Sequence, residues 1–124
     1  MKLGLQETIT LGNLDAERDW GYAKDFVRAM WLMLQQEEAG DFVLATGKSH
    51  SIRELLDIAF DRVGLNWQDH VVESERFKRP TDPTQLLGNP TKANKVLGWE
   101  CEVNFKQLVH LMVDNDLDQL RDAT

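Results

Sequence analysis

The strongest hydrophobic pattern in the chain is a set of apolar residues spaced three and four positions apart between residues 22 and 38. Such spacing is typical of one face of an amphipathic helix, so the sequence predicts a helix over about 22–38. Gly40 follows as a stop signal. The apolar positions of this helix are Phe26, Val27, Met30, Trp31, Met33 and Leu34.

A second helix is predicted from the signal at its N-terminus. Ser51 is followed three residues later by Glu54, which is a capping-box pattern. The helix that starts there carries an apolar stripe on one side and ends at Gly64. The stripe consists of Ile52, Leu55, Leu56, Ala59, Phe60 and Val63.

Two more helices are predicted near the C-terminus. Asn89, followed by a proline, is typical of a helix start, and Gly98 closes the short helix over 91–97. Asn104 is placed to cap a last helix that runs to about residue 120. The inward-facing positions of this last helix are predicted to be Phe105, Leu108, Val109, Met112 and Leu117.

Three stretches have strand character. Residues 7–11 contain consecutive β-branched residues, and a second short strand is predicted at Val71 and Val72. Residues 41–46 form an apolar run between two glycines, as in a strand buried on both faces of a parallel sheet. A buried strand needs neighbours, and no other stretch has this character. We therefore expect the chain to be a fragment of a larger sheet.

Length and charge restrict the kinds of protein that this chain can be. A chain of 124 residues forms one domain at most, with a modest core. The formal net charge of -7 and the pI near 4.9 argue against nucleic acid or an anionic membrane as a partner, because both require a basic surface. A small anionic ligand is still compatible, since it responds to local charge.

The cysteine, the histidines and the hydropathy of the chain further restrict the kinds of protein that it can be. The single cysteine, Cys101, cannot form an internal disulfide and fits a reducing cytosol, where we expect an inert thiol. No apolar run approaches the ~20 residues of a membrane span, and the first residues lack the apolar core of a signal peptide. The three histidines have no metal-ligand spacing, and His50 is expected in a loop or capping role.

Two short motifs carry arginines that are candidates for ligand binding. Arg18 lies in the run LGNLDAERDWG over residues 11–21, and Arg79 opens the run RPTD. The planar guanidinium fork matches phosphate oxygens, so two arginines that converge on one pocket are suited to a diphosphate. Taken alone, each arginine is also typical of a surface ion pair.

These motifs, in this order, resemble a known family. The C-terminal part of the GDP-mannose 4,6-dehydratase family, within the extended short-chain dehydrogenase/reductase superfamily, is similar to the runs LGNLDAERDWGYAKDFVRAMWLMLQQ, DFVLATGKSHSIRELL, RPTD and NPTKANKVLGW. The resemblance extends from about residue 3 to about residue 120. LGNLDAERDWG is specific to the dehydratases, whereas RPTD and KANKVLGW are shared with other nucleotide-sugar epimerases and dehydratases.

The resemblance implies a fold, an activity and a cofactor. The fold class is expected to be α/β, a C-terminal fragment of a Rossmann-type NAD(P)-binding fold with a small, mainly helical nucleotide-sugar-binding subdomain. Residues 1–124 would be a single fragment in which both parts interleave. The complete enzyme would convert GDP-mannose to GDP-4-keto-6-deoxymannose, on the way to GDP-fucose and related deoxysugars. NADP would be reduced and reoxidised within one turnover.

The resemblance also assigns substrate-binding roles to four residues. Arg18 and Arg79 would hold the diphosphate, and Asp82 would contact the ribose hydroxyls. The dehydratases usually have glutamate at this last position, which is one methylene longer than the aspartate here. Asn13, at the end of the first predicted strand, would approach the nucleotide, and its alternative role is that of a strand-ending turn residue.

The residues that carry the redox chemistry of the superfamily are missing from this sequence. It contains no glycine-rich dinucleotide turn of the G-x-x-G-x-x-G or G-x-G-x-x-G type and no Tyr-x-x-x-Lys pair. Tyr22 and Lys24 are two positions apart, so their side chains would point to different sides of a helix. We therefore expect no catalytic, cofactor-binding or metal-binding residue, and a role in gripping GDP-mannose or a related nucleotide sugar.

Two alternatives stay open at this point, and both would leave the chain without catalysis. The chain would be either a stand-alone module that binds nucleotide sugars or partners, or a truncated product without function. A fragment with an unpaired strand and an exposed helix face also tends to associate with itself. We therefore expect a homo-oligomer that its charge of -7 keeps soluble.

Overall fold

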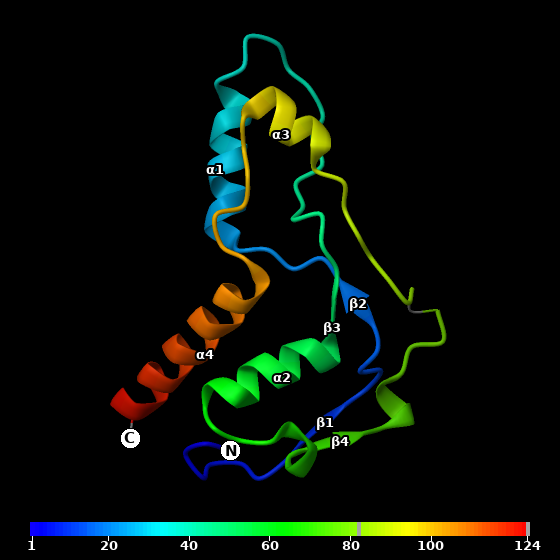
Figure 1. Cartoon of the computed structure of the whole chain (residues 1–124), viewed down its shortest axis with the longest axis vertical. Coiled ribbons are helices and arrows are strands. Elements are labelled where there is room, and N and C mark those ends of the chain that lie inside the picture. The colour runs from blue at the N-terminus through cyan, green and yellow to red at the C-terminus, as the bar shows by residue number, and fades with distance from the viewer. Residues whose placement is uncertain (82, 124) are drawn as a thin grey trace.

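The computed structural model describes residues 1–81 and 83–123, and Figure 1 shows how their helices and strands are arranged. Helices α1 (Ala23–Leu34) and α3 (Thr91–Leu97) pack together at one end of the molecule. Helices α2 (Ile52–Arg62) and α4 (Phe105–Asp122) contact each other nearer the other end. The short strands are β1 (Ile9–Leu11), β2 (Glu17–Arg18), β3 (His50–Ser51) and β4 (Val71–Glu73), and the two 3-10 helices are Trp67–Asp69 and Glu75–Phe77.

The helix ends confirm several of the predicted signals. Ser51 Oγ accepts a hydrogen bond from the Glu54 amide at 3.1 Å where α2 begins. Asn104 and Gln107 form a complete capping box at the start of α4, with both hydrogen bonds at 2.9 Å. Gly98 ends α3 with a φ of 62°, a left-handed conformation that glycine adopts without steric cost. Local sequence therefore determines where these helices begin and end.

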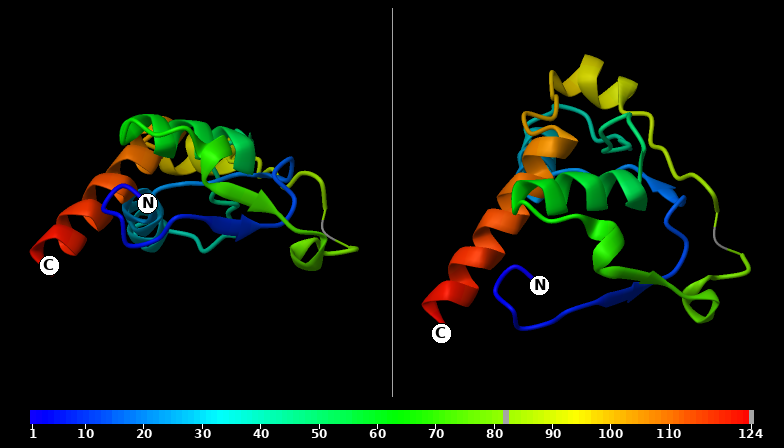
Figure 2. Two further views of the ribbon diagram at one scale, coloured as in Figure 1. Left: turned by 90° about the horizontal axis from the view of Figure 1, so that it is seen from below. Right: turned by 60° about the horizontal axis from the view of Figure 1, so that its bottom comes forward.

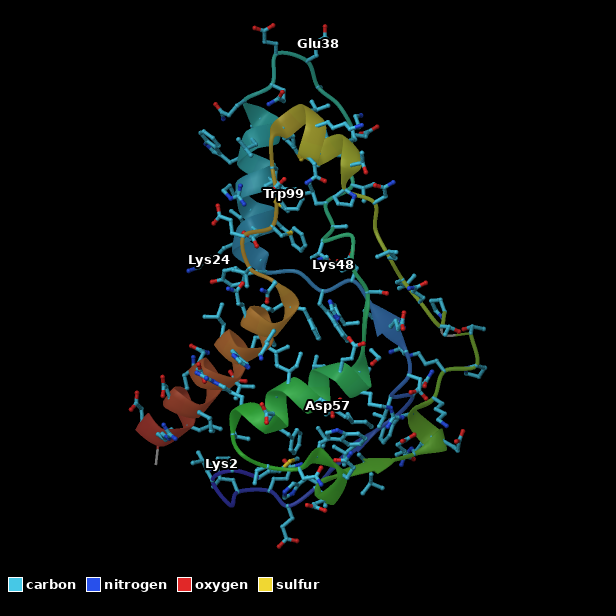
Figure 3. The ribbon with its side chains drawn as sticks, viewed as in Figure 1. Lys2, Lys24, Glu38, Lys48, Asp57 and Trp99 are labelled. Atoms are coloured by element: carbon cyan, nitrogen blue, oxygen red, sulfur yellow. The ribbon has the colours of Figure 1, made fainter. Side chains whose placement is uncertain are left out.

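Two separate clusters of buried apolar residues form small cores in the described part of the chain. The first lies between α1 and α3 and contains the fully buried indole of Trp99 (Figure 3). The second lies where α2 covers the pair of strands β1 and β4 (Figure 2). Buried members of the first core are Ala29, Ala93, Leu97 and Trp99, and those of the second are Leu14, Leu56 and Trp67.

The strands form two separate two-stranded ladders. β1 pairs in parallel with β4, with Ile9 opposite Val71. β2 pairs antiparallel with β3, with Arg18 opposite His50. The short strand predicted at residues 71–72 is confirmed, and the strand predicted over 7–11 is confirmed in its last three residues. It is short because β4 offers only three partner residues.

The predicted buried strand over 41–46 is absent from the described structure. These residues belong to neither ladder, and Val43 is 57% exposed. A strand forms when a second strand pairs with its backbone N–H and C=O groups, and the described part of the chain places none beside this run. The prediction of a strand buried on both faces is therefore wrong for this chain taken by itself.

Two helices also differ from the prediction in detail. α1 ends at Leu34 and not near residue 38, because the polar residues that follow have no apolar side to bury. Met112, predicted to face inward, is 57% exposed, since the buried residues of α4 lie in its first turns. None of the helices in the described residues is long and apolar enough to cross a membrane.

Candidate functional site

The segment formed by residues 83–88, which directly follows the second arginine motif in the chain, lies along β2. The Glu17 amide donates to the Thr84 carbonyl at 2.8 Å, and the Leu86 amide donates to the Glu17 carbonyl at 3.1 Å. Arg18 Nη1 donates to the Pro83 carbonyl at 3.1 Å. Contacts from two consecutive residues of β2 therefore fix the 83–88 segment beside the first motif.

The Glu17 carboxylate extends this arrangement toward β3. Its Oε2 accepts hydrogen bonds from Ser49 Oγ at 3.1 Å and from Gln85 Nε2 at 2.9 Å. Gln85 Nε2 also donates to Ser49 Oγ at 2.7 Å. One carboxylate thus joins the loop before β3, strand β2 and the 83–88 segment. The backbone around Arg18 is therefore held in place by hydrogen bonds.

Arg79 lies in the chain just before this fixed segment. It is exposed and precedes Pro83 by four residues. Four extended residues span at most about 14 Å, so the backbone of Arg79 cannot lie farther than that from the carbonyl that Arg18 binds. Chain connectivity therefore limits how far apart the two arginine motifs can lie. Their joint grip on a diphosphate stays a prediction, and Asp82 lies outside the described residues.

Asn13 occupies a tight turn after β1. Its Oδ1 accepts a hydrogen bond from the Asp15 amide at 3.0 Å, and the residue is exposed. An asparagine that bonds to the backbone two residues ahead stabilises the turn at the end of a strand. This is the alternative role considered from the sequence, and the proposed contact of Asn13 with the nucleotide stays a prediction.

Asp19, next to Arg18, was missed by the sequence analysis. Its Oδ1 accepts from the Thr46 amide at 3.0 Å and from Thr46 Oγ1 at 2.6 Å. Its Oδ2 accepts from the amides of Gly47 at 3.0 Å and Gly88 at 3.3 Å. No local signal could have revealed this, because the donors lie 27 to 69 positions away in the sequence.

A cavity of about 480 Å³ lies near β3 and the start of α4. Its aromatic wall consists of Phe105 stacked with Trp20 at 5.4 Å and with His50 at 4.0 Å between ring centroids. His50 Nδ1 also lies 2.7 Å from Glu54 Oε2. The cavity lining includes Trp20 of the first motif but neither Arg18 nor Arg79, so the two arginines lie on a different part of the surface.

Cys101 lies in the same cavity wall and is partly buried. Burial raises the pKa of its thiol above the usual value, and the nearby carboxylates of Asp25 and Asp19 raise it further. A higher pKa lowers the fraction of thiolate, which is the nucleophilic form. This environment agrees with the inert thiol expected from the sequence. Within residues 1–81 and 83–123, no three His, Cys, Asp or Glu side chains are grouped to hold a metal ion.

The architecture defines the class of protein. The chain superposes on RMD from Pseudomonas aeruginosa, solved as a complex with NADPH, with a TM-score of 0.81 and 25% identity over 92% of this chain and 37% of that one. It superposes equally well on a UDP-glucose 4-epimerase from Thermotoga maritima, solved with UDP-glucose, with a TM-score of 0.79 and 25% identity over 97% and 37% of the two chains. The fold is thus that of the corresponding part of Rossmann-type epimerases and dehydratases.

Within that class the sequence identifies the family. The family model described as "GDP-mannose 4,6 dehydratase" matches residues 1–112, and the chain belongs to this family. GDP-mannose 4,6 dehydratase 1 of Arabidopsis thaliana is 52% identical over 118 residues, which cover 95% of this chain and 33% of the relative. The Homo sapiens enzyme is 43% identical over 136 residues, which cover 96% and 37%. The chain therefore spans about a third of the length of these relatives, which agrees with the expected C-terminal portion of such an enzyme.

Proposed function

We propose that this chain is the part of a GDP-mannose 4,6-dehydratase that grips the diphosphate of the nucleotide sugar. The observation that supports this most directly is the hydrogen bond from Arg18 Nη1 to the Pro83 carbonyl at 3.1 Å. It places the first arginine motif against the segment that follows the second. The matches to dehydratases over almost the whole chain favour this role over a stand-alone module or a product without function.

The proposed grip follows from charge and geometry. Arg18 and Arg79 supply planar guanidinium groups, each of which can donate two parallel hydrogen bonds to phosphate oxygens. Asp82 would accept from the ribose hydroxyls, and Asn13 would lie near the nucleotide. In an acidic chain with a net charge of -7, two arginines close together provide the local positive charge that a diphosphate needs.

NADP would belong to the complete enzyme and not to this chain. A dinucleotide pyrophosphate requires a glycine-rich turn between a strand and the start of a helix. In the described residues, the parallel strands β1 and β4 lead into a turn and a 3-10 helix, and neither connection is rich in glycine. The residues present therefore do not fit the cofactor, and this chain contributes no step of the redox chemistry.

The proposal also covers the cellular compartment and the partners of the protein. A single cysteine and a nucleotide-sugar ligand fit the reducing cytosol. Nothing in the composition favours nucleic acid or a membrane as a partner. An association of the chain with further copies of itself is also expected, because α1 leaves an apolar side exposed.

Calorimetric titration of the 124-residue chain with GDP, with mannose as a second titrant, tests this function. We expect saturable binding of GDP and none of mannose at the same concentrations, because the arginines recognise phosphate and not the sugar ring. The absence of saturable GDP binding would contradict the proposal.

A further inference from the structure

Asp19 joins three chain segments that are far apart in the sequence. Its two carboxylate oxygens accept four hydrogen bonds, two from Thr46, one from the Gly47 amide and one from the Gly88 amide. The residue stands directly after Arg18 in the chain, and Gly88 ends the 83–88 segment that β2 holds. One carboxylate therefore links the loop after residue 45, the strand of Arg18 and the segment that follows Arg79.

A carboxylate is the group that this position requires. All four partners are N–H or O–H donors, and an ionised carboxylate is a pure acceptor with two oxygens. An asparagine would turn its NH2 group toward amide or hydroxyl donors on one side, and would lose the charge that shortens and strengthens these bonds. The geometry thus distinguishes aspartate from its closest isostere.

The backbone at Gly88 lies so close to its neighbours that no space is left for a side chain at this position. A Cβ added to Gly88 would overlap the Cβ of Ala45, which is buried. The 83–88 segment therefore rests directly on the loop whose amides Asp19 binds. A change in the Asp19 contacts would shift this segment, and with it the backbone that Arg18 Nη1 contacts at Pro83.

We propose that Asp19 is the positioning residue of the diphosphate site. By holding Thr46, Gly47 and Gly88 together, it fixes the 83–88 segment beside β2 and so sets where Arg18 stands relative to the chain that carries Arg79. This inference rests on the proposed function. It assigns to Asp19 no contact with the ligand, and its effect on binding runs through the placement of Arg18.

Asp25 provides a matched control for this proposal. It is a second aspartate whose carboxylate accepts backbone hydrogen bonds, from the amides of Glu102 and Val103, both at 3.2 Å. Its contacts lie on α1 and the loop before α4, and none of them involves β2 or the 83–88 segment. Both Asp19→Asn and Asp25→Asn remove a carboxylate that accepts backbone hydrogen bonds. Only Asp19→Asn removes one that contacts the proposed site.

The test compares the affinities of the folded variants for GDP and GMP by calorimetry. We expect Asp19→Asn to weaken GDP binding by about tenfold or more and to reduce the ratio of GDP to GMP affinity, because the placement of two arginines matters most for a diphosphate. Asp25→Asn should lower stability and leave this ratio unchanged. A general loss of structure would lower both affinities together and would not change the ratio.

Thr46 supplies a second, milder pair of variants in case Asp19→Asn does not fold. Thr46→Ser keeps the hydroxyl that donates to Asp19, whereas Thr46→Val removes it at nearly constant shape. We expect Thr46→Val to weaken GDP binding and to reduce the GDP to GMP ratio, and Thr46→Ser to bind as the wild type does. Equal affinities for the two variants would overturn the proposal.

The outcomes separate this inference from the proposed function. If the wild-type chain does not bind GDP, the proposed function and the inference both fail. If Arg18→Ala loses GDP binding but Asp19→Asn keeps the wild-type ratio of GDP to GMP affinity, the proposed function stands and the positioning role is wrong. If Asp25→Asn reduces that ratio as much as Asp19→Asn does, the role of Asp19 is that of a general structural carboxylate.

Discussion

The indole of Trp99 donates its Nε1–H to the backbone carbonyl of Asp25 at 2.8 Å, and both residues are buried. The Asp25 carboxylate in turn accepts the amides of Glu102 and Val103. The first turn of α1 is therefore tied to both ends of the short loop that follows α3. This arrangement satisfies a buried carboxylate and a buried indole at once, which is the condition for keeping either group away from water.

Replacing Trp99 with phenylalanine should destabilise the chain. The substitution removes a buried hydrogen bond and leaves space in the core between α1 and α3, so we expect a loss of about 2 kcal/mol or more in the free energy of unfolding. Denaturant titration measures it. Trp31→Phe is the matched control, because Trp31 is 59% exposed and its change should cost less than about 0.5 kcal/mol. Similar losses for both variants would contradict the buried role of Trp99.

Removing either motif arginine should weaken GDP binding. Each charge-assisted contact is worth roughly 1.5–3 kcal/mol, so Arg18→Ala and Arg79→Ala should each reduce the affinity for GDP by about tenfold or more. Arg62→Ala is the control, because Arg62 pairs with Asp114 on the surface between α2 and α4. Calorimetry that finds unchanged affinity for both motif variants would show that the assignment is wrong.

The 124-residue chain should not catalyse dehydration by itself. It lacks the glycine-rich turn for a dinucleotide and the Tyr-x-x-x-Lys pair, which are the groups that a hydride transfer in this superfamily requires. Incubation of the purified chain with GDP-mannose and NADP, followed by detection of the 4-keto sugar nucleotide, measures this. Product above the background of a heat-denatured sample would disprove the prediction.

The chain should associate with itself through the exposed face of α1. Four apolar residues at helical spacing are more than half exposed on this face: Val27, Met30, Trp31 and Leu34. Light scattering over a dilution series should therefore show a concentration-dependent mass. Met30→Glu should shift the equilibrium toward monomer, whereas Met112→Glu, at an equally exposed methionine on α4, should not. A monomer at high concentration would contradict this expectation.

The reactivity of Cys101 should depend on pH in a direction set by its burial. Because burial raises the pKa of the thiol in the folded chain, the thiolate fraction at pH 8 is lower than in the unfolded chain. Alkylation should therefore be slower in the native protein than in urea at pH 8, and its rate should rise at a higher pH than in the unfolded chain. Equal native and unfolded rates at pH 8 would contradict it.

Local signals in the sequence predicted the helices well. Caps such as Ser51 and Asn104, and the stop at Gly98, act within one turn of the residues that they satisfy, so their effect is readable from neighbouring positions. Asp19 and Asp25 were not predicted as structural carboxylates, because their donors lie far away in the sequence. A carboxylate carries no local mark of the amides that it will bind.

Predictions that depend on a partner surface were less successful. The apolar run over 41–46 and the stripe on α1 indicate segments suited to burial, but they do not say whether the covering surface belongs to the same chain. Val43 and Leu34 are exposed for that reason. The arginine motifs were predicted to lie near each other, and β2 does hold the segment that follows Arg79, whereas the ligand that they would share is known only by chemical inference.

The parallel pairing of β1 with β4 also has a consequence for how the chain folds. Ile9 and Val71 face each other across 71 − 9 = 62 positions of sequence, and the whole of α2 lies between them. Closing so long a loop is opposed by chain entropy. A ladder of three residues stabilises the closed loop only weakly until other elements pack against it. We therefore expect the pair to form only once α2 has folded and covers it, so that the part of the chain containing Leu14 and Trp67 assembles around a helix and not around a sheet.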